Sequence, residues 1–379
     1  MSHALLDYCL AREDWLLRFT ETLVQIESPS DDKAAVDRCA DEVARELAHL
    51  GGRITRIGAT TAGDHVRAEF GAGNRQVLLL GHIDTVWPIG QLARMPLRRE
   101  GDRLYGPGVF DMKAGLAIAT LAVRAWAAGE VARSHKLVML WTTDEEVGSL
   151  TSRAVIETEA GRSEAVLVFE PALPGGGLKT RRKGCGQYEL SVTGRAAHAG
   201  VDPEKGVSAI GELARQILAI ETLRDLEAGV SVNVGLVSGG SRPNVVADHA
   251  RAVIDVRAPT QQMAERVDAA LRRLTPHIRG AGVVVSGGFA RPPMERTAGT
   301  TRLFDLASQV AGDLGVSLTE GATGGGSDGN FCAALGVPTL DGLGATGDGA
   351  HAVHEHVVVS SLAQRAGLVA GLLTRLTAA

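Results

Sequence analysis

Residues 76–84, Gln-Val-Leu-Leu-Leu-Gly-His-Ile-Asp, join a short apolar run to a histidine and an aspartate. Continuous apolar runs of this length are typical of parallel strands that are buried on both faces. Residues 136–142 and 165–169 have the same character, and an Ala-rich helix is expected at 114–128, between the first two runs. This alternation predicts an α/β fold with a mixed, mainly parallel sheet and helices on both faces.

The apolar pattern extends this fold to both ends of the chain. The further elements that it predicts are helices at 15–25, 33–50 and 301–314, a strand at 337–340 and a C-terminal helix.

A second domain is expected to start near Gly184, where Tyr188, Leu190 and Val192 alternate with polar residues as in a half-exposed strand. The sequence then predicts a helix, two strands, a helix and a strand at 206–221, 230–237, 249–257, 261–274 and 282–287. Together these form the βαββαβ order of a ferredoxin-like α+β unit. We therefore expect a catalytic domain of residues 1–182 and 292–379, with an inserted dimerisation or lid domain at 183–291.

Bulk properties exclude several classes of protein. The chain has 379 residues and a net charge of -5, so it lacks the basic excess that nucleic-acid binding requires. Its apolar runs are too short to span a membrane, and its N-terminus does not have the pattern of a secretory signal. The four cysteines lack CxxC spacing, which argues against a thiolate zinc site or a disulfide framework. These features predict a cytoplasmic protein with no membrane or nucleic-acid partner.

Acidic and imidazole groups follow the predicted strands, at the edge where open α/β sheets bind ligands. Histidine and carboxylate ligands without cysteine suit Zn²⁺, Mn²⁺ or Co²⁺, and paired metals can clamp a carbonyl oxygen and a water together. The groups are His82, Asp84, Asp144, Glu145, Glu146, Glu170 and His351, with Asp111 in a turn before the helix at 114–128.

Two pairs within this set have more than one interpretation. His82 and Asp84 lie on the same face of an extended segment, so Asp84 could hold the imidazole, although both could also be structural. Glu145 and Glu146 could be solvated loop acids. Because adjacent side chains diverge, one could instead bind metal while the other transfers a proton.

Three motifs carry a family resemblance: residues 81–88 (Gly-His-Ile-Asp-Thr-Val-Trp-Pro), 106–113 (Gly-Pro-Gly-Val-Phe-Asp-Met-Lys) and 144–149 (Asp-Glu-Glu-Val-Gly-Ser). They resemble the signatures of the zinc exopeptidase and deacylase family that contains glutamate carboxypeptidase, acetylornithine deacetylase and succinyl-diaminopimelate desuccinylase. The resemblance implies two zinc ions per subunit, for which Co²⁺ or Mn²⁺ can substitute. Asp111 would bridge them, His82 and Glu170 would complete one shell, and Glu146 and His351 the other.

The resemblance also implies roles for residues around the metals. Glu145 would be the general base, and Asp84 would orient His82. His351 is preferred to His354 as the last ligand because the family's histidine precedes a glutamate by about four residues, as His351 precedes Glu355.

The predicted second domain carries further marks of the family. Residues 194–200 resemble the segment whose histidine, here His198, reaches the partner subunit's active site in a homodimer. Asn244 and Arg257 resemble substrate-contacting residues, although an asparagine after a proline is normally only a turn.

One departure from the deacetylase pattern favours the glutamate carboxypeptidase branch, because residues 106–108 read Gly-Pro-Gly where deacetylases of the family have Gly-Arg-Gly. Arg291 resembles an arginine of that branch that binds the substrate's terminal carboxylate, although it could equally be a solvated linker arginine. The Gly-rich run at 324–328, with Gly326, also matches this branch. A phosphate-binding loop is the rival interpretation, but no Gly-Lys-Ser/Thr follows and the run is not expected to lie directly between a strand and a helix.

The sequence thus predicts a metallohydrolase that cleaves the amide bond to a C-terminal amino acid, glutamate-like in folate-type or N-acyl substrates, by two-zinc activation of water. The alternatives are an N-acyl amino acid deacylase and a non-catalytic binding protein on the same scaffold.

Overall fold

A computed structural model describes residues 2–129 and 134–378 and divides the chain into two compact units. The first unit comprises Met1–Thr180, Arg296–Ala322 and Ser327–Ala379, and the second comprises Arg181–Glu295 and Thr323–Gly326. The Gly-rich run is therefore shared between the units rather than belonging wholly to the first.

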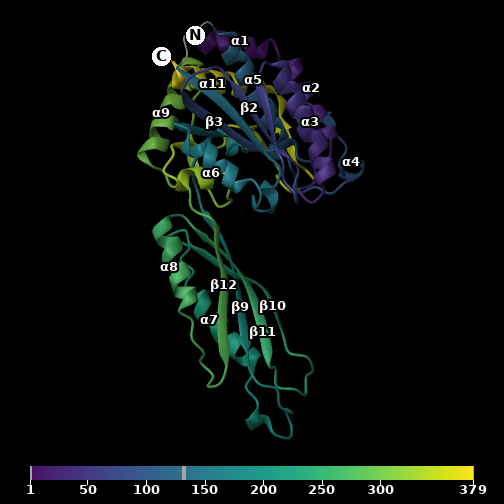
Figure 1. Cartoon of the computed structure of the whole chain (residues 1–379), viewed down its shortest axis with the longest axis vertical. Helices are drawn as coiled ribbons and strands as arrows, with labels where there is room; N and C mark the ends of the chain where they lie inside the picture. Colours follow the sequence, from purple (N-terminus) through teal and green to yellow (C-terminus); the bar gives the residue numbers. More distant parts are fainter. Residues whose placement is uncertain (1, 130–133, 379) are drawn as a thin grey trace. The chain divides into compact units, whose positions relative to one another are not determined.

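A six-stranded mixed sheet forms the centre of the first unit (Figure 1). Its order is β1 (Arg53–Ile57), β2 (His65–Phe70), β6 (His135–Thr142), β3 (Arg75–His82), β7 (Ala165–Val168) and β14 (Thr339–Leu340). The pairs from β6 to β14 are parallel, whereas β1 and β2 are antiparallel. The α/β expectation is confirmed; β1 and β2 were not anticipated.

Helices cover both faces of this sheet, which explains why β3 is apolar at successive positions. Val77 and Leu79 belong to one core, whereas Leu78 and Leu80 belong to another. The first core includes residues of α1 (Ser2–Leu10), α2 (Glu13–Gln25), α3 (Lys33–His49), α5 (Ala114–Ala128), α9 (Ala298–Asp313) and α11 (Val359–Thr377). The second includes residues of α6 (Arg153–Gly161) and α10 (Gly329–Ala334).

Short strands hold the loops beside the main sheet. A four-stranded antiparallel sheet has the order β15 (Gly347–Asp348), β16 (His356–Val358), β5 (Arg103–Tyr105) and β4 (Arg98–Glu100). Because β16 pairs with β5, the loop that carries His351 is held close to the turn that carries Asp111. A two-stranded sheet joins β8 (Leu178–Arg182) to β13 (Glu320–Thr323), and a single-turn helix α4 spans Gln91–Arg94.

The second unit has the predicted βαββαβ order. It contains β9 (Gly184–Thr193), α7 (Ala209–Glu221), β10 (Ser231–Gly239), β11 (His249–Ala258), α8 (Gln261–Arg272) and β12 (Gly282–Arg291). The strands form an antiparallel sheet in the order β10-β11-β9-β12 (Figure 1). Tyr188, Leu190 and Val192 of β9 are buried in a core with residues of α7 and α8, as the alternation predicts.

The first helix was missed because its apolar residues follow no clear period. Ser2–Leu10 packs against α11, with Leu6 beside Gly367. Within residues 2–129 and 134–378, no helix is long and apolar enough to cross a bilayer.

Candidate metal centre

The carboxyl ends of three adjacent parallel strands bring most of the predicted ligands together. In register, His82 at the end of β3 lies opposite Thr142 at the end of β6, and Leu80 lies opposite Val168 at the end of β7. Glu145 and Glu146 follow β6 in a short 3₁₀ turn (Glu145–Val147), and Glu170 follows β7. The edge of the sheet that the sequence singled out is therefore where these side chains lie.

Asp111 occupies the middle of the cluster, with its two oxygens facing different histidines. Its Oδ1 lies 3.3 Å from Nε2 of His82, and its Oδ2 lies 3.5 Å from Nε2 of His351. Glu170 Oε1 lies 3.6 Å from the same His82 nitrogen, and Glu146 Oε2 lies 3.2 Å from that of His351. The arrangement is thus two histidine–carboxylate sets that share one aspartate.

The donor atoms fit metal ions. Ligand atoms of His82, Asp111 and Glu146 lie within 4.8 Å of one another, as do those of His82, Glu145 and Glu170. Among the described residues, Asp111 Oδ1 and Glu146 Oε1 are buried without a hydrogen-bond partner. Since buried oxygens rarely remain unsatisfied, and imidazole with carboxylate is suitable ligation for zinc, these residues can accommodate two divalent cations.

Protonation of the cluster follows from the same contacts. The neighbouring carboxylates of Asp111 and Glu146 raise the pKa of His351 to about 10. Burial opposes protonation of His82, yet its contacts with Asp111 and Asp84 raise its pKa well above the usual value. Burial alone would raise the pKa of Asp111, but its contacts with His351 and His82 lower it. Protons thus hold the positions that metal cations would take, so metal binding should release protons.

Asp84 has a second role beyond the predicted one. Its backbone oxygen lies 2.9 Å from Nδ1 of His82, closer than its carboxylate at 3.5 Å. The carboxylate instead accepts hydrogen bonds from Ser30 Oγ at 2.6 Å and from the backbone N–H groups of Glu145 and Glu146, each at 3.2 Å. Asp84 therefore positions both glutamates as well as the histidine.

Glu355 is a positioning residue. In the sequence it served only as the reason to prefer His351 to His354 as a ligand. Its buried carboxylate accepts hydrogen bonds from the backbone N–H groups of Gly108, Phe110 and Asp111 and from Nε1 of Trp87, at 2.8 to 3.0 Å. Trp87 lies in the first family motif and Asp111 in the second, so Glu355 joins these motifs to the His351 loop. The sequence feature that could have indicated this role is the position of Glu355 four residues after His351.

His351 and His354 differ sharply in their surroundings. His351 has a left-handed backbone, with a φ of 61°, which turns its imidazole towards Asp111 and Glu146. Both imidazoles are exposed, and the difference lies in their contacts: within residues 2–129 and 134–378, no ion pair joins His354 to Asp111 or Glu146. This geometry favours His351 as the ligand.

The second unit gathers three of the predicted substrate-binding residues. Cys185 of β9 lies opposite Arg257 of β11 on one side and Arg291 of β12 on the other. A Cβ on Gly326 would lie 2.9 Å from Cδ of Arg291 and 3.0 Å from Sγ of Cys185, so the glycine permits this close approach. Arg257 also forms two hydrogen bonds with Asp255, at 2.8 and 3.0 Å.

His198 and Asn244 lie together elsewhere in the second unit. His198 bridges to Val245, and the backbone oxygen of Asn244 accepts from Ala199 N–H. Both residues are exposed; His198 follows the far end of β9, and Asn244 lies in the loop that leads to His249, which pairs with Thr193 at that same end, whereas Cys185 is at the start of β9. At about 3.3 Å per residue the two ends of β9 are roughly 30 Å apart, so the unit does not bring His198 and Asn244 to Arg257 and Arg291.

One argument against a phosphate-binding loop was wrong. The Gly-rich run at 324–328 does lie between a strand and a helix, namely β13 and α10. Gly329, Asn330 and Phe331 follow it, so the lysine and hydroxyl of a phosphate loop are absent from the sequence here. Instead, Arg182 donates to the backbone oxygens of Gly325 and Gly326, which fixes the loop in place.

Comparisons with known proteins agree with this arrangement. Carboxypeptidase G2 of Pseudomonas sp. (strain RS-16) is 32% identical, over 96% of this chain and 89% of that protein. A succinyl-diaminopimelate desuccinylase of Delftia acidovorans (strain DSM 14801 / SPH-1) is 25% identical, over 91% of this chain and 94% of its own. The crystal structure of aminopeptidase PepT from Bacillus cereus ATCC 10987 has the same fold, with a TM-score of 0.79 at 22% identity, covering 95% of this chain and 97% of that one.

The resemblance inferred from the motifs is therefore confirmed, and with it the expectation of an enzyme rather than a non-catalytic binding protein. The model of peptidase family M20/M25/M40 matches residues 78–375, which include every predicted metal ligand. This chain belongs to peptidase family M20/M25/M40 and is a metallohydrolase of that family.

Proposed function

We propose that this enzyme hydrolyses the amide bond to a C-terminal amino acid, glutamate or a residue like it, in folate-type or N-acyl substrates. The observation that carries hydrolysis by a two-metal site is Asp111, whose two oxygens face separate histidine–carboxylate sets. Two zinc ions would be held there by His82, Asp111, Glu146, Glu170 and His351. The 32% identity to carboxypeptidase G2 and the Gly-Pro-Gly motif at 106–108 support the carboxypeptidase branch.

The side chains divide the chemistry of such a reaction among themselves. When bound, the two cations would polarise the amide carbonyl and lower the pKa of water. Glu145 takes a proton from the attacking water and returns it to the departing nitrogen. Asp84 fixes the backbone of Glu145 for this transfer, and Glu355 fixes that of Asp111.

Arg291, with Gly326 beside it, is proposed to bind the terminal carboxylate of the substrate. A guanidinium can bind a carboxylate through two parallel hydrogen bonds, a geometry that lysine cannot reproduce. Arg257 and Asn244 are proposed as further substrate contacts.

The alternative within the family is an N-acyl amino acid deacylase, which the identity to a succinyl-diaminopimelate desuccinylase supports. A panel separates the two: N-acyl amino acids of varied acyl group against N-aroyl and folate-type glutamates, each with Zn²⁺, Mn²⁺ or Co²⁺ added. A preference set by the acyl group rather than by the C-terminal residue would favour the deacylase.

Removing the carboxylate anchor should raise KM. We expect Arg291→Ala to raise KM about tenfold or more for an N-acyl glutamate, because a charge-assisted hydrogen bond worth about 1.5–3 kcal/mol is lost. For substrates whose terminal carboxylate is replaced by a carboxamide, the KM of Arg291→Ala should equal that of the wild type. Arg273→Ala, an exposed arginine at the end of α8, is the matched control. Equal kinetics of wild type and Arg291→Ala on both substrates would exclude this role.

We also propose a homodimer, formed through the sheet of the second unit, in which His198 stabilises the oxyanion in the partner's site. The separation of His198 from Arg291 along β9 supports action on a second chain, and the sheet has two edge strands that can pair across a two-fold axis. A cytoplasmic location belongs to the same proposal; the four free cysteines are compatible with it.

Mixing inactive subunits tests the dimer. His198→Ala and Glu145→Gln chains, each with little activity alone, should regain activity after subunit exchange, because one site in each heterodimer keeps both groups. Sedimentation as a fully active monomer would refute the arrangement, as would exchanged heterodimers that remain inactive.

A further inference from the structure

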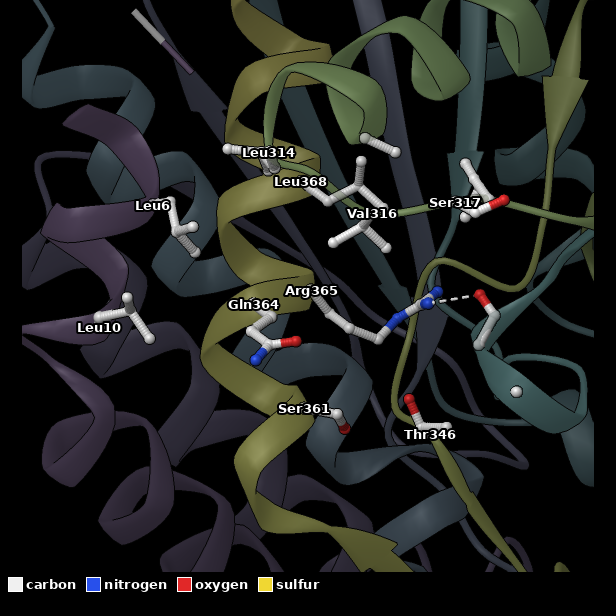
Figure 2. Close-up of a pocket in the computed structure, with 14 residues that line it drawn as sticks. Leu6, Leu10, Leu314, Val316, Ser317, Thr346, Ser361, Gln364, Arg365 and Leu368 are labelled. Carbon is white, nitrogen blue, oxygen red and sulfur yellow. Dashed lines mark hydrogen bonds between the residues drawn. The ribbon is translucent and has the colours of Figure 1, made fainter. Parts of the chain in front are cut away.

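The first unit contains a pocket of about 420 Å³ that none of the proposed metal ligands lines. It lies between α1, α11, the segment 314–318 and the turn at 174–176 (Figure 2). From α11, Ser361, Gln364, Arg365 and Leu368 line it, at the i, i+3, i+4 and i+7 positions that share one face of a helix. The pocket is therefore a feature of regular elements rather than of one loop.

The apolar part of the pocket wall is open to solvent at two residues. Leu10 is 43% exposed and Val316 is 50% exposed. Exposed apolar side chains that line one cavity are typical of ligand sites, because their cover by an apolar group is favourable. The larger apolar side chains of the lining are Leu6, Leu10, Leu314, Val316, Leu318 and Leu368.

The charged group of the pocket is Arg365, which is only 6% exposed. Its Nη1 donates to Gly176 O at 2.8 Å, its Nη2 donates to Gly342 O, and its Nε has no partner among the described residues. No carboxylate in residues 2–129 or 134–378 forms an ion pair with it. Burial lowers the pKa of Arg365 to about 10, so the guanidinium is still cationic at neutral pH.

A purely structural role explains only part of this arrangement. Arg365 does tie two loop carbonyls together, at Gly176 and Gly342. However, a buried cation without a counter-ion is costly, and neutral carbonyls supply no opposite charge. The structural role also leaves Nε unsatisfied and does not account for the open apolar wall.

We propose that this pocket binds a small monocarboxylate with an apolar chain, whose head group pairs with Arg365. A Cβ on Gly176 would lie 3.4 Å from Nη1 of Arg365 and 4.0 Å from Oγ1 of Thr346, so the cation and the hydroxyl border the same space. One guanidinium balances one negative charge, which favours a carboxylate over a phosphate dianion. The chain then covers the leucines and Val316. The proposal is independent of the reaction at the metal centre.

Octanoate is the probe, titrated calorimetrically into the full-length, zinc-loaded enzyme. We expect one octanoate per chain outside the metal centre. Acetate, which lacks the chain, and 1-octanol, which lacks the charge, should each bind at least about tenfold more weakly, since each loses one of the two recognised features. Failure of octanoate to bind, or equal binding of 1-octanol, would overturn the proposal.

Two variants locate the site. Arg365→Met removes the charge and keeps the apolar stem, and Val316→Trp narrows the mouth from an exposed loop while leaving Arg365 in the sequence. Each should weaken octanoate binding at least about tenfold. Leu226→Trp, at an exposed leucine of the second unit, should bind octanoate like the wild type.

If Arg365→Met does not fold, Val316→Trp decides the question. If octanoate still binds like the wild type when both residues are substituted, or when Val316→Trp alone is tested, the ligand lies elsewhere, such as at the metal ions. Either result would refute the proposal that this pocket binds it.

Discussion

Replacing Glu145 with glutamine should lower kcat by roughly 10² or more while the bound metal stays at the wild-type level. An amide of the same shape cannot accept a proton, and general base catalysis typically contributes 10²–10⁴-fold. The hydrogen bond from the backbone N–H of Glu145 to Asp84 does not involve the altered group, so the turn should keep its geometry. Steady-state kinetics and metal analysis of the same preparation measure both quantities.

Glu146→Gln is the matched partner of this variant, because it makes the same change one residue away. Glu146 Oε2 faces His351 at 3.2 Å, so this variant should lose metal as well as activity. The comparison is informative since a ligand atom of Glu145 also lies within 4.8 Å of those of His82 and Glu170. If Glu145→Gln lost metal and Glu146→Gln kept it, the two roles would have to be exchanged.

Replacing His351 with alanine should remove one metal per chain and most activity, whereas His354→Ala should do neither. Partners of metal ligands typically contribute 10–100-fold in metal affinity, so a ligand itself should contribute at least about 100-fold. The two histidines lie in one loop, but only His351 reaches Asp111 and Glu146. His82→Ala and Asp111→Ala should likewise lose metal, with Asp111→Ala affecting both ions.

Metal content by mass spectrometry, with competition from a chelator of known affinity, checks this prediction. If His354→Ala lost metal and His351→Ala retained it, the role of metal ligand would have to be assigned to His354 instead. Circular dichroism of each variant separates metal loss from unfolding.

The sequence alone was sufficient for the parallel strands of the sheet and for the acidic and imidazole side chains that directly follow them. The apolar runs at 76–80, 136–142 and 165–169 could be buried on both faces only in a sheet covered by helices, which is where β3, β6 and β7 lie. His82, Glu145, Glu146 and Glu170 follow directly, so the strand ends placed them together. The alternation in β9 similarly predicted a sheet with one covered face.

Other elements had no such signal. β1 and β2 were missed because they are short, carry charged residues and pair antiparallel at one side of the sheet. A local pattern does not distinguish such strands from loops. The helix at Ser2–Leu10 is likewise defined by its packing on α11 rather than by a clear period.

Only the tertiary structure decided which side chains serve one another across long separations. Glu355 binds the turn that carries Asp111, 244 residues earlier in the sequence, because β16 pairs with β5 and brings the two loops together. The length of β9 keeps His198 away from Arg291, although their sequence motifs belong to one family pattern. Nothing in the sequence pattern predicts that Arg365 is buried. It is buried because α11, α1 and two loops enclose it. Periodicity determines what a segment buries, whereas partners and separations depend on how segments are joined in space.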